Sequence, residues 1–73
     1  MDEQKILETF GFNFKMYRTR QKMSQDDVVE KTGLSKSYIS NVENGKHRIS
    51  LINALKLSEL VGKGIETMLR SID

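Results

Sequence analysis

Residues 36–44 place hydrogen-bonding side chains where an α-helix would expose them together. With Ile39 as the reference direction and about 100° per residue, Val42 and Glu43 fall within roughly 60° of it, on an inner side. The opposite face holds small polar residues and no acid: Ser37, Ser40, Asn41 and Asn44, with Lys36 near one edge. An ordinary solvated helix face carries Glu–Lys pairs instead. Donors and acceptors of this kind can reach base edges in a DNA major groove without repelling phosphate, so the face is a candidate for base contacts.

Basic residues gather around this segment, although the net charge of the 73-residue chain is only +2. Residues 15–22 contain four basic residues and no acid, and Lys36 and the run Lys46-His47-Arg48 add positive charge beside the polar face. Clustering of this kind on one face is the electrostatic footprint of a nucleic-acid binder. The alternative is that these residues only keep the domain soluble, and the sequence alone leaves that alternative open.

The sequence offers few candidate catalytic residues. The chain has one histidine, His47, and no cysteine, which excludes disulfides and thiolate metal sites. Asp26 and Asp27 are a pair only in sequence, because neighbours at a helix N-terminus do not face each other and suit the helix dipole there. The sequence contains no complete glycine-rich phosphate loop and no cluster of metal ligands. We therefore expect no enzyme, metal, cofactor or small-molecule ligand.

Two short helices must position the polar face, and residues 24–45 predict both. Ser24 is a suitable N-cap, and Asp27 three residues later completes a variant of the capping box. Gly33 ends the first helix, because glycine readily adopts the left-handed conformation at a helix C-terminus. Ser35 caps the second helix, which ends at residues 44–45. Helix, glycine-containing turn and helix together form a helix-turn-helix.

Helices are also predicted on both sides of residues 24–45. Apolar residues recur at spacings of three and four in residues 3–22, and Gly11 within this stripe suggests either a break or close packing, with residues 1–9 as an added turn or an arm. Ser50 caps a helix over about 51–61, and residues 65–72 mark a last one. The pattern predicts one all-α domain over residues 10–73, with no signal peptide and no membrane span.

Several short motifs recur in a fixed order: Gly11-x-x-Phe14-x-x-Tyr17-Arg18, Ser24-Gln25, Gly33-Leu34-Ser35, Tyr38-Ile39-Ser40 and Val42-Glu43-Asn44-Gly45. Each motif alone is weak, but the ordered set resembles the XRE (Cro and phage-repressor) helix-turn-helix family from about residue 11 to residue 69. The resemblance implies a five-helix, lambda-repressor-like DNA-binding domain. Among its members the chain is similar to small stand-alone regulators such as restriction–modification controller proteins. Lys22 departs from the family pattern, which usually has glycine at that position.

The resemblance also implies roles for individual residues. Base edges are read by side chains of the polar face: Lys36, Ser37, Ser40 and Asn41. Phosphates are held at the two helix N-termini and around the end of the second helix: Gln25, Ser35, Tyr38, Asn44, Lys46, His47 and Arg48. A carboxylate on the inner side of its helix needs a partner, and the resemblance pairs Glu43 with Arg18 as a salt bridge. The alternative for that pair is two separately solvated charges.

A two-fold dimer is the last feature that the resemblance implies, because the final helix often builds one in small members of the family. The candidate interface residues are Leu60, Ile65, Met68, Leu69 and Ile72, although such a stripe is more often core than interface. The expected function is a sequence-specific regulator of transcription that binds double-stranded DNA as a homodimer, at a pseudo-palindromic operator, in the cytoplasm at the nucleoid. The alternative is a protein-interaction module, such as an antitoxin or adaptor, with the same fold. Acids on the outer face would favour it, and there are none.

Overall fold

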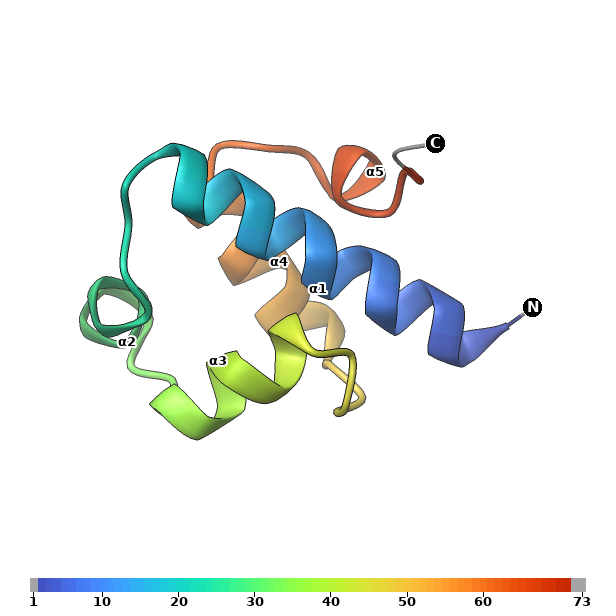
Figure 1. The fold of residues 1–73 in the computed structure, drawn as a ribbon, viewed down its shortest axis with the longest axis horizontal. Coiled ribbons are helices and arrows are strands. Elements are labelled where there is room, and N and C mark those ends of the chain that lie inside the picture. The colour runs from blue at the N-terminus through green and yellow to red at the C-terminus, as the bar shows by residue number, and fades with distance from the viewer. Residues whose placement is uncertain (1, 72–73) are drawn as a thin grey trace.

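Five helices make up the part of the chain that the computed structural model describes, residues 2–71 (Figure 1). Their bounds are α1 (Glu3–Arg20), α2 (Gln25–Thr32), α3 (Lys36–Glu43), α4 (Leu51–Leu60) and α5 (Ile65–Met68). Residues 2–71 contain no strand, so the predicted all-α, five-helix class is confirmed. In Figure 1, α1 crosses the middle of the view, with α2 and α3 on one side, α5 on the other and α4 behind it.

The starts of α2, α3 and α4 are set by serine N-caps, as the sequence predicts. Ser24, Ser35 and Ser50 each accept a hydrogen bond at 3.0–3.1 Å from the backbone N–H three residues later. At α2 the bond is returned, because Asp27 Oδ2 accepts from the backbone N–H of Ser24 at 2.8 Å. The hydrogen bonds from the backbone and side chain of Ser24 lower the pKa of Asp27 from its usual range. Each cap satisfies a donor that the helix itself leaves unpaired.

α1 runs unbroken through Gly11, and residues 3–9 form its first turns. Of the two alternatives that the sequence leaves open at Gly11, close packing is therefore the correct one. A Cβ atom built on Gly11 would overlap the carbonyl oxygen of Val42 and lie 2.9 Å from that of Glu43. Only a residue without a side chain lets α1 approach the end of α3 this closely.

α1 ends at Arg20 rather than at residue 22, in a Schellman turn. The backbone N–H groups of Lys22 and Met23 both donate at 3.0 Å to carbonyls of the last turn of α1. This geometry puts Lys22 at a φ of 57°, in the left-handed region that favours glycine. The same turn after α3 uses Gly45, at a φ of 68°. Within residues 2–71, Lys22 is the one residue other than glycine with a positive φ, a conformation that its Cβ atom disfavours.

The last helix is shorter than predicted and belongs to the core. α5 ends at Met68, not at residue 72, and the Met68 side chain is fully buried. The prediction that Met68 contributes to a dimer interface is therefore wrong. It packs in one cluster with apolar side chains from the other four helices and their ends: Phe10, Phe14, Val28, Ile39, Val42, Ala54, Leu57 and Val61.

Asn13 of α1 explains where α5 ends and why it lies on the core. Its buried amide Nδ2 donates to the carbonyl of Met68 at 2.7 Å and to that of Arg70 at 2.9 Å. Carbonyls at a helix C-terminus lack partners within the helix, and this amide supplies one while it draws α5 onto α1.

The remaining candidates for the dimer interface differ in exposure. Leu60 and Ile65 are half-buried and pack against the core, Leu69 is exposed, and Ile72 lies outside the described residues.

Candidate nucleic-acid interface

α3 turns its inner face into the core and its polar face outward. Its buried residues are Ile39, Val42 and Glu43. Of the four predicted base readers, Lys36 and Ser37 are exposed, and Ser40 and Asn41 are half-buried. The base readers in the first turn of α3 are therefore the more accessible ones, and the N-terminal residues of a recognition helix are the ones that contact base edges.

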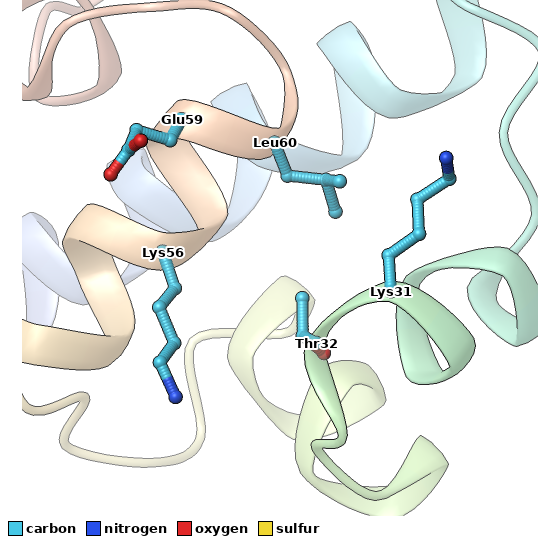
Figure 2. Close-up of a pocket in the computed structure, with 5 residues that line it drawn as sticks. All are labelled: Lys31, Thr32, Lys56, Glu59 and Leu60. Atoms are coloured by element: carbon cyan, nitrogen blue, oxygen red, sulfur yellow. The ribbon is translucent and has the colours of Figure 1, made fainter.

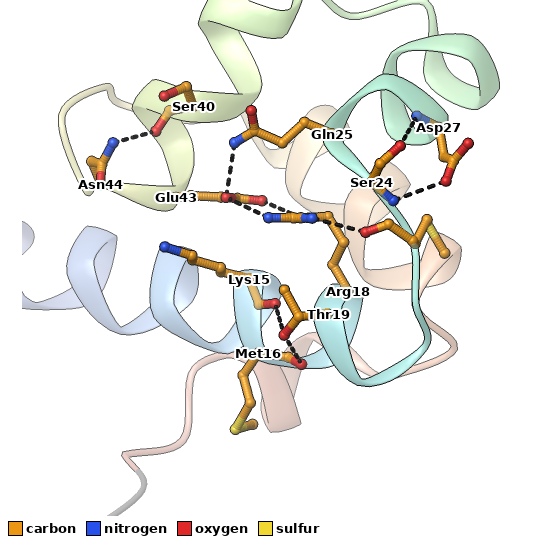
Figure 3. A network of polar contacts seen from close by, with 11 residues as sticks. Lys15, Met16, Arg18, Thr19, Ser24, Gln25, Asp27, Ser40, Glu43 and Asn44 are labelled. Atoms are coloured by element: carbon orange, nitrogen blue, oxygen red, sulfur yellow. Dashed lines mark hydrogen bonds and ion pairs between the residues drawn. The ribbon is translucent and has the colours of Figure 1, made fainter.

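A buried ion pair ties α1 to α3 (Figure 3). Arg18 donates to the Glu43 carboxylate through Nε at 2.6 Å and through Nη2 at 3.1 Å. The two side chains are only 9% and 3% exposed, so they are not separately solvated. Arg18 Nη1 also donates to the carbonyl of Met23 at 2.8 Å, in the turn before α2. One guanidinium therefore holds the end of α3 and the entry to α2 at the same time.

Gln25 joins this ion pair from the first turn of α2 (Figure 3). Its Nε2 donates to Glu43 Oε1 at 3.1 Å, so the Glu43 carboxylate accepts three hydrogen bonds from α1 and α2. Within residues 2–71, no buried side-chain nitrogen or oxygen lacks a hydrogen-bond partner. One amide proton of Gln25 is thus committed to holding α3, and the second remains for the phosphate contact expected at the α2 N-terminus.

The N-terminus of α3 holds two more of the expected contact residues. Ser35 Oγ accepts the capping hydrogen bond from the backbone, and its exposed hydroxyl can still donate. Lys36 Nζ lies 3.2 Å from Asp26 Oδ1 of α2, and both side chains are largely exposed. A surface ion pair of this kind contributes little, so Lys36 can readily exchange Asp26 for an acceptor on DNA.

The loop after α3 carries three exposed cationic or titratable residues, Lys46, His47 and Arg48. The His47 ring stacks on that of Tyr38, with ring centroids 6.1 Å apart and planes 20° apart. The Tyr38 hydroxyl in turn accepts a hydrogen bond from Asn53 Nδ2 of α4 at 3.1 Å. The stack holds His47 against α3, and the Tyr38–Asn53 bond ties α3 to α4, while the side chains of Lys46, His47 and Arg48 remain exposed.

Asn44 and Arg48, two more of the predicted phosphate ligands, also make contacts within the chain. Asn44 Nδ2 donates to the carbonyl of Ser40 at 2.9 Å, which leaves its second amide proton for a phosphate (Figure 3). Arg48 Nη2 donates to both carboxylate oxygens of Glu3, at 3.0 and 2.8 Å. Sequence reasoning did not find Glu3, because 45 residues separate it from Arg48. The opposite charges of the acidic first ten residues and the basic loop are the one signal that points to this contact.

A shallow hollow of about 480 Å³ lies between α2 and α4, lined by Lys31, Thr32, Lys56, Glu59 and Leu60 (Figure 2). The amines of Lys31 and Lys56 point away from each other, so they do not form one anion site. Within the described residues, no group of three or more His, Cys, Asp or Glu side chains is arranged to hold a metal ion. No helix between residues 2 and 71 is long and apolar enough to cross a membrane.

Comparison with known proteins identifies a family and several similar proteins. The family model described as "Helix-turn-helix" (HTH_3) matches residues 14–67. A hypothetical transcription factor of Neisseria meningitidis serogroup B is 30% identical over 61 residues, which is 84% of this chain and 58% of that relative's own length. The crystal structure of the restriction-modification controller protein C.AhdI from Aeromonas hydrophila has a TM-score of 0.78 and 32% identity, over 85% of this chain and 94% of that one. That of the hypothetical transcription factor NHTF from Neisseria has a TM-score of 0.86 and 26% identity, over 99% of this chain and 83% of that one.

Proposed function

The chain belongs to the Helix-turn-helix family HTH_3, and from this membership we propose that it binds double-stranded DNA sequence-specifically, as a homodimer, and regulates transcription. Similar proteins named as a hypothetical transcription factor and as a restriction-modification controller support a DNA-binding regulator. The observation that carries the proposal is the outward, acid-free polar face of α3, which the buried Arg18–Glu43 pair holds against α1. Rigid presentation of such a face is what base readout requires.

Base readout is assigned to Lys36, Ser37 and Asn41, with Ser40 beside them. A lysine can donate to guanine O6 and N7, and an asparagine can pair with both N6 and N7 of adenine. Lys36 and Ser37 lie exposed in the first turn of α3, and Asn41 follows one turn later. Helical spacing therefore puts Ser37 and Asn41 on one face, with Lys36 near its edge, and the major groove can accommodate that face.

Phosphate contacts are assigned to the two helix N-termini and to the loop after α3. Gln25 and Ser35 stand where backbone N–H groups and the helix dipole favour an anion. The loop contributes the exposed side chains of Lys46, His47 and Arg48, with Tyr38 and Asn44 beside it. Phosphate contacts fix the position of the protein on the duplex, whereas base contacts select the sequence. The two groups should therefore respond differently to mutation.

A homodimer is supported by apolar side chains that the single chain leaves in solvent. Leu51 and Ile52, in the first turn of α4, are 69% and 63% exposed, and Leu55 in the next turn and Leu69 after α5 are exposed as well. α4 and α5 pack on each other. Clustered exposed apolar residues mark interaction surfaces. We therefore place the interface on the exposed side chains of α4 rather than on Met68, and Leu69 remains a separate candidate. A two-fold dimer requires half-sites about 34–36 Å apart on the duplex.

The regulatory role follows from the dimer. An operator site that is filled only when enough dimer has accumulated makes the protein a concentration-driven switch, as a repressor or as a controller of restriction–modification genes. Such a regulator acts in the cytoplasm, at the nucleoid. The operator sequence is then a pseudo-palindrome, because its two halves match the two-fold symmetry of the protein dimer.

Selection of duplexes from a random library by the purified protein, at near-physiological salt, tests this function. We expect a palindrome whose half-sites lie one helical turn apart. Sedimentation of the complex should give two chains per duplex, and Ile52→Gln should reduce that dimer. Phe12→Gln is the matched control, because Phe12 is an exposed apolar residue on α1. Weak, salt-sensitive binding with no enriched sequence would instead indicate a protein-interaction module.

A further inference from the structure

The first two turns of α1 lie against the loop that carries the proposed phosphate ligands. Gln4 Nε2 donates to the carbonyl of Gly45 at 2.9 Å. Glu8 packs on the same glycine, since a Cβ atom there would lie 2.8 Å from Glu8 Cγ and 3.1 Å from Glu8 Cα. These contacts place the acidic end of α1 next to the basic residues that follow Gly45.

Glu3 completes this arrangement with a charge pair. Its carboxylate accepts both hydrogen bonds of Arg48 Nη2, at 2.8 and 3.0 Å, while the side chains of Glu3 and Arg48 stay 69% and 80% exposed. A carboxylate and a phosphate offer a guanidinium the same paired oxygen acceptors. Glu3 therefore occupies Nη2 of the guanidinium that a DNA phosphate would bind, at a site that DNA can still reach.

We infer that Glu3 sets the DNA affinity of this chain by competing with phosphate for Arg48, an inference that rests on the proposed DNA binding. Arg48 binds Glu3 in the free protein and exchanges it for a backbone phosphate in the complex. After the exchange the Glu3 carboxylate remains nearby and repels the duplex, so its presence lowers affinity twice. The residues that match the family model begin at residue 14, so Glu3 lies before the matched stretch.

The expected effect is uniform across DNA sequences. Phosphate contacts carry no sequence information, so removal of the Glu3 charge should lower the Kd for the operator and for a random duplex by the same factor. An exposed ion pair contributes little to the stability of the free protein, so little is regained when it no longer has to be broken. We therefore expect the affinity for DNA to rise by about 2- to 5-fold. The dependence of log Kd on log salt should steepen by up to about one unit, because no freed Glu3 carboxylate then takes up a counterion when Arg48 binds phosphate.

Fluorescence anisotropy with the selected operator and with a random duplex of equal length, over a salt series, tests the inference. Glu3→Gln should tighten binding to both duplexes equally, and most of the gain should disappear when Glu3→Gln is combined with Arg48→Gln, which leaves only the repulsion between Glu3 and the duplex. Glu30→Gln is the charge control, since it removes an exposed acid on α2, and it should change Kd by less than about twofold. Urea midpoints of all variants establish that each one is folded.

Three results would overturn the inference while DNA binding stands: no gain or a loss in Glu3→Gln, an equal gain in the Arg48→Gln background, or an equal gain in Glu30→Gln. The second result would show that Glu3 lowers affinity only by repelling the DNA. The third result would show that only the net charge of the protein determines the change in Kd. Failure of the wild type to bind either duplex would overturn the proposed function and this inference together. The wild-type control thus separates the two failures.

Discussion

Replacement of Arg18 by methionine removes the cation that neutralises Glu43 and keeps most of the side-chain volume. Glu43 would lose two of its three hydrogen bonds and keep only the one from Gln25, in a position where 3% of its side chain is exposed. The carbonyl of Met23 would lose its bond from Arg18 as well. Breaking a buried pair in this way costs about 3–5 kcal/mol, because an uncompensated charge stays buried.

That cost is large against the whole stability of the domain. At about 0.05–0.15 kcal/mol per residue, a chain of this length has a free energy of unfolding of roughly 4–11 kcal/mol. With a urea m-value near 1 kcal/mol per molar, the midpoint of Arg18→Met should fall by about 3 M or more, and the protein could unfold without urea. Circular dichroism over a urea series measures the shift.

A paired replacement separates the ion pair from the packing of Arg18. Arg18→Met combined with Glu43→Leu leaves no stranded charge, and apolar pairs of similar volume often match a buried ion pair in stability. We expect the double variant to recover to within about 1 kcal/mol of the wild type. Arg20→Met is the matched control, since Arg20 is exposed at the end of the same helix. If Arg18→Met shifted the midpoint no more than Arg20→Met, the claim that this pair fixes α3 would be refuted.

Three further predictions concern the backbone and the loop. Lys22→Gly should raise the free energy of unfolding by about 0.5–1 kcal/mol in urea titrations, because it relieves a left-handed conformation, whereas a similar gain in Lys22→Ala would contradict this reason. Gly11→Ala should destabilise by about 1–3 kcal/mol, since its Cβ would overlap the Val42 carbonyl; helix propensity alone predicts the opposite sign, so a rise in the urea midpoint would refute the close packing. Lys46→Ala should weaken binding to all duplexes and flatten the salt slope by about one unit, and an unchanged slope would exclude a phosphate contact.

Local chemistry made much of the fold predictable. The serine caps act on backbone groups three residues away, so the starts of α2, α3 and α4 can be read from a few neighbouring residues. The two faces of α3 follow from helical periodicity in the same way. The partner of Glu43 lies 25 residues away in sequence, so burial indicated only that a partner was needed. Resemblance to a known family was required to name Arg18.

The features that sequence reasoning missed depend on contacts between distant residues. The periodicity of residues 65–72 predicts a longer helix, but the amide of Asn13, 55 residues away, binds the Met68 carbonyl and places the end of α5 on the core. The Glu3–Arg48 pair spans 45 residues. An asparagine or a glutamate carries no local signal of which distant group it will meet, so neither contact could be derived before the helices were placed.

The most direct test of the central claim, that the outer face of α3 reads DNA sequence, is selection of duplexes with the wild type and with Asn41→Ala in parallel. We expect Asn41→Ala to retain the palindrome and its spacing but to lose preference at one base pair of each half-site, with a cost of about 1–3 kcal/mol there. Positions read by other residues should keep their preference. An unchanged motif for Asn41→Ala would contradict this placement of the recognition face.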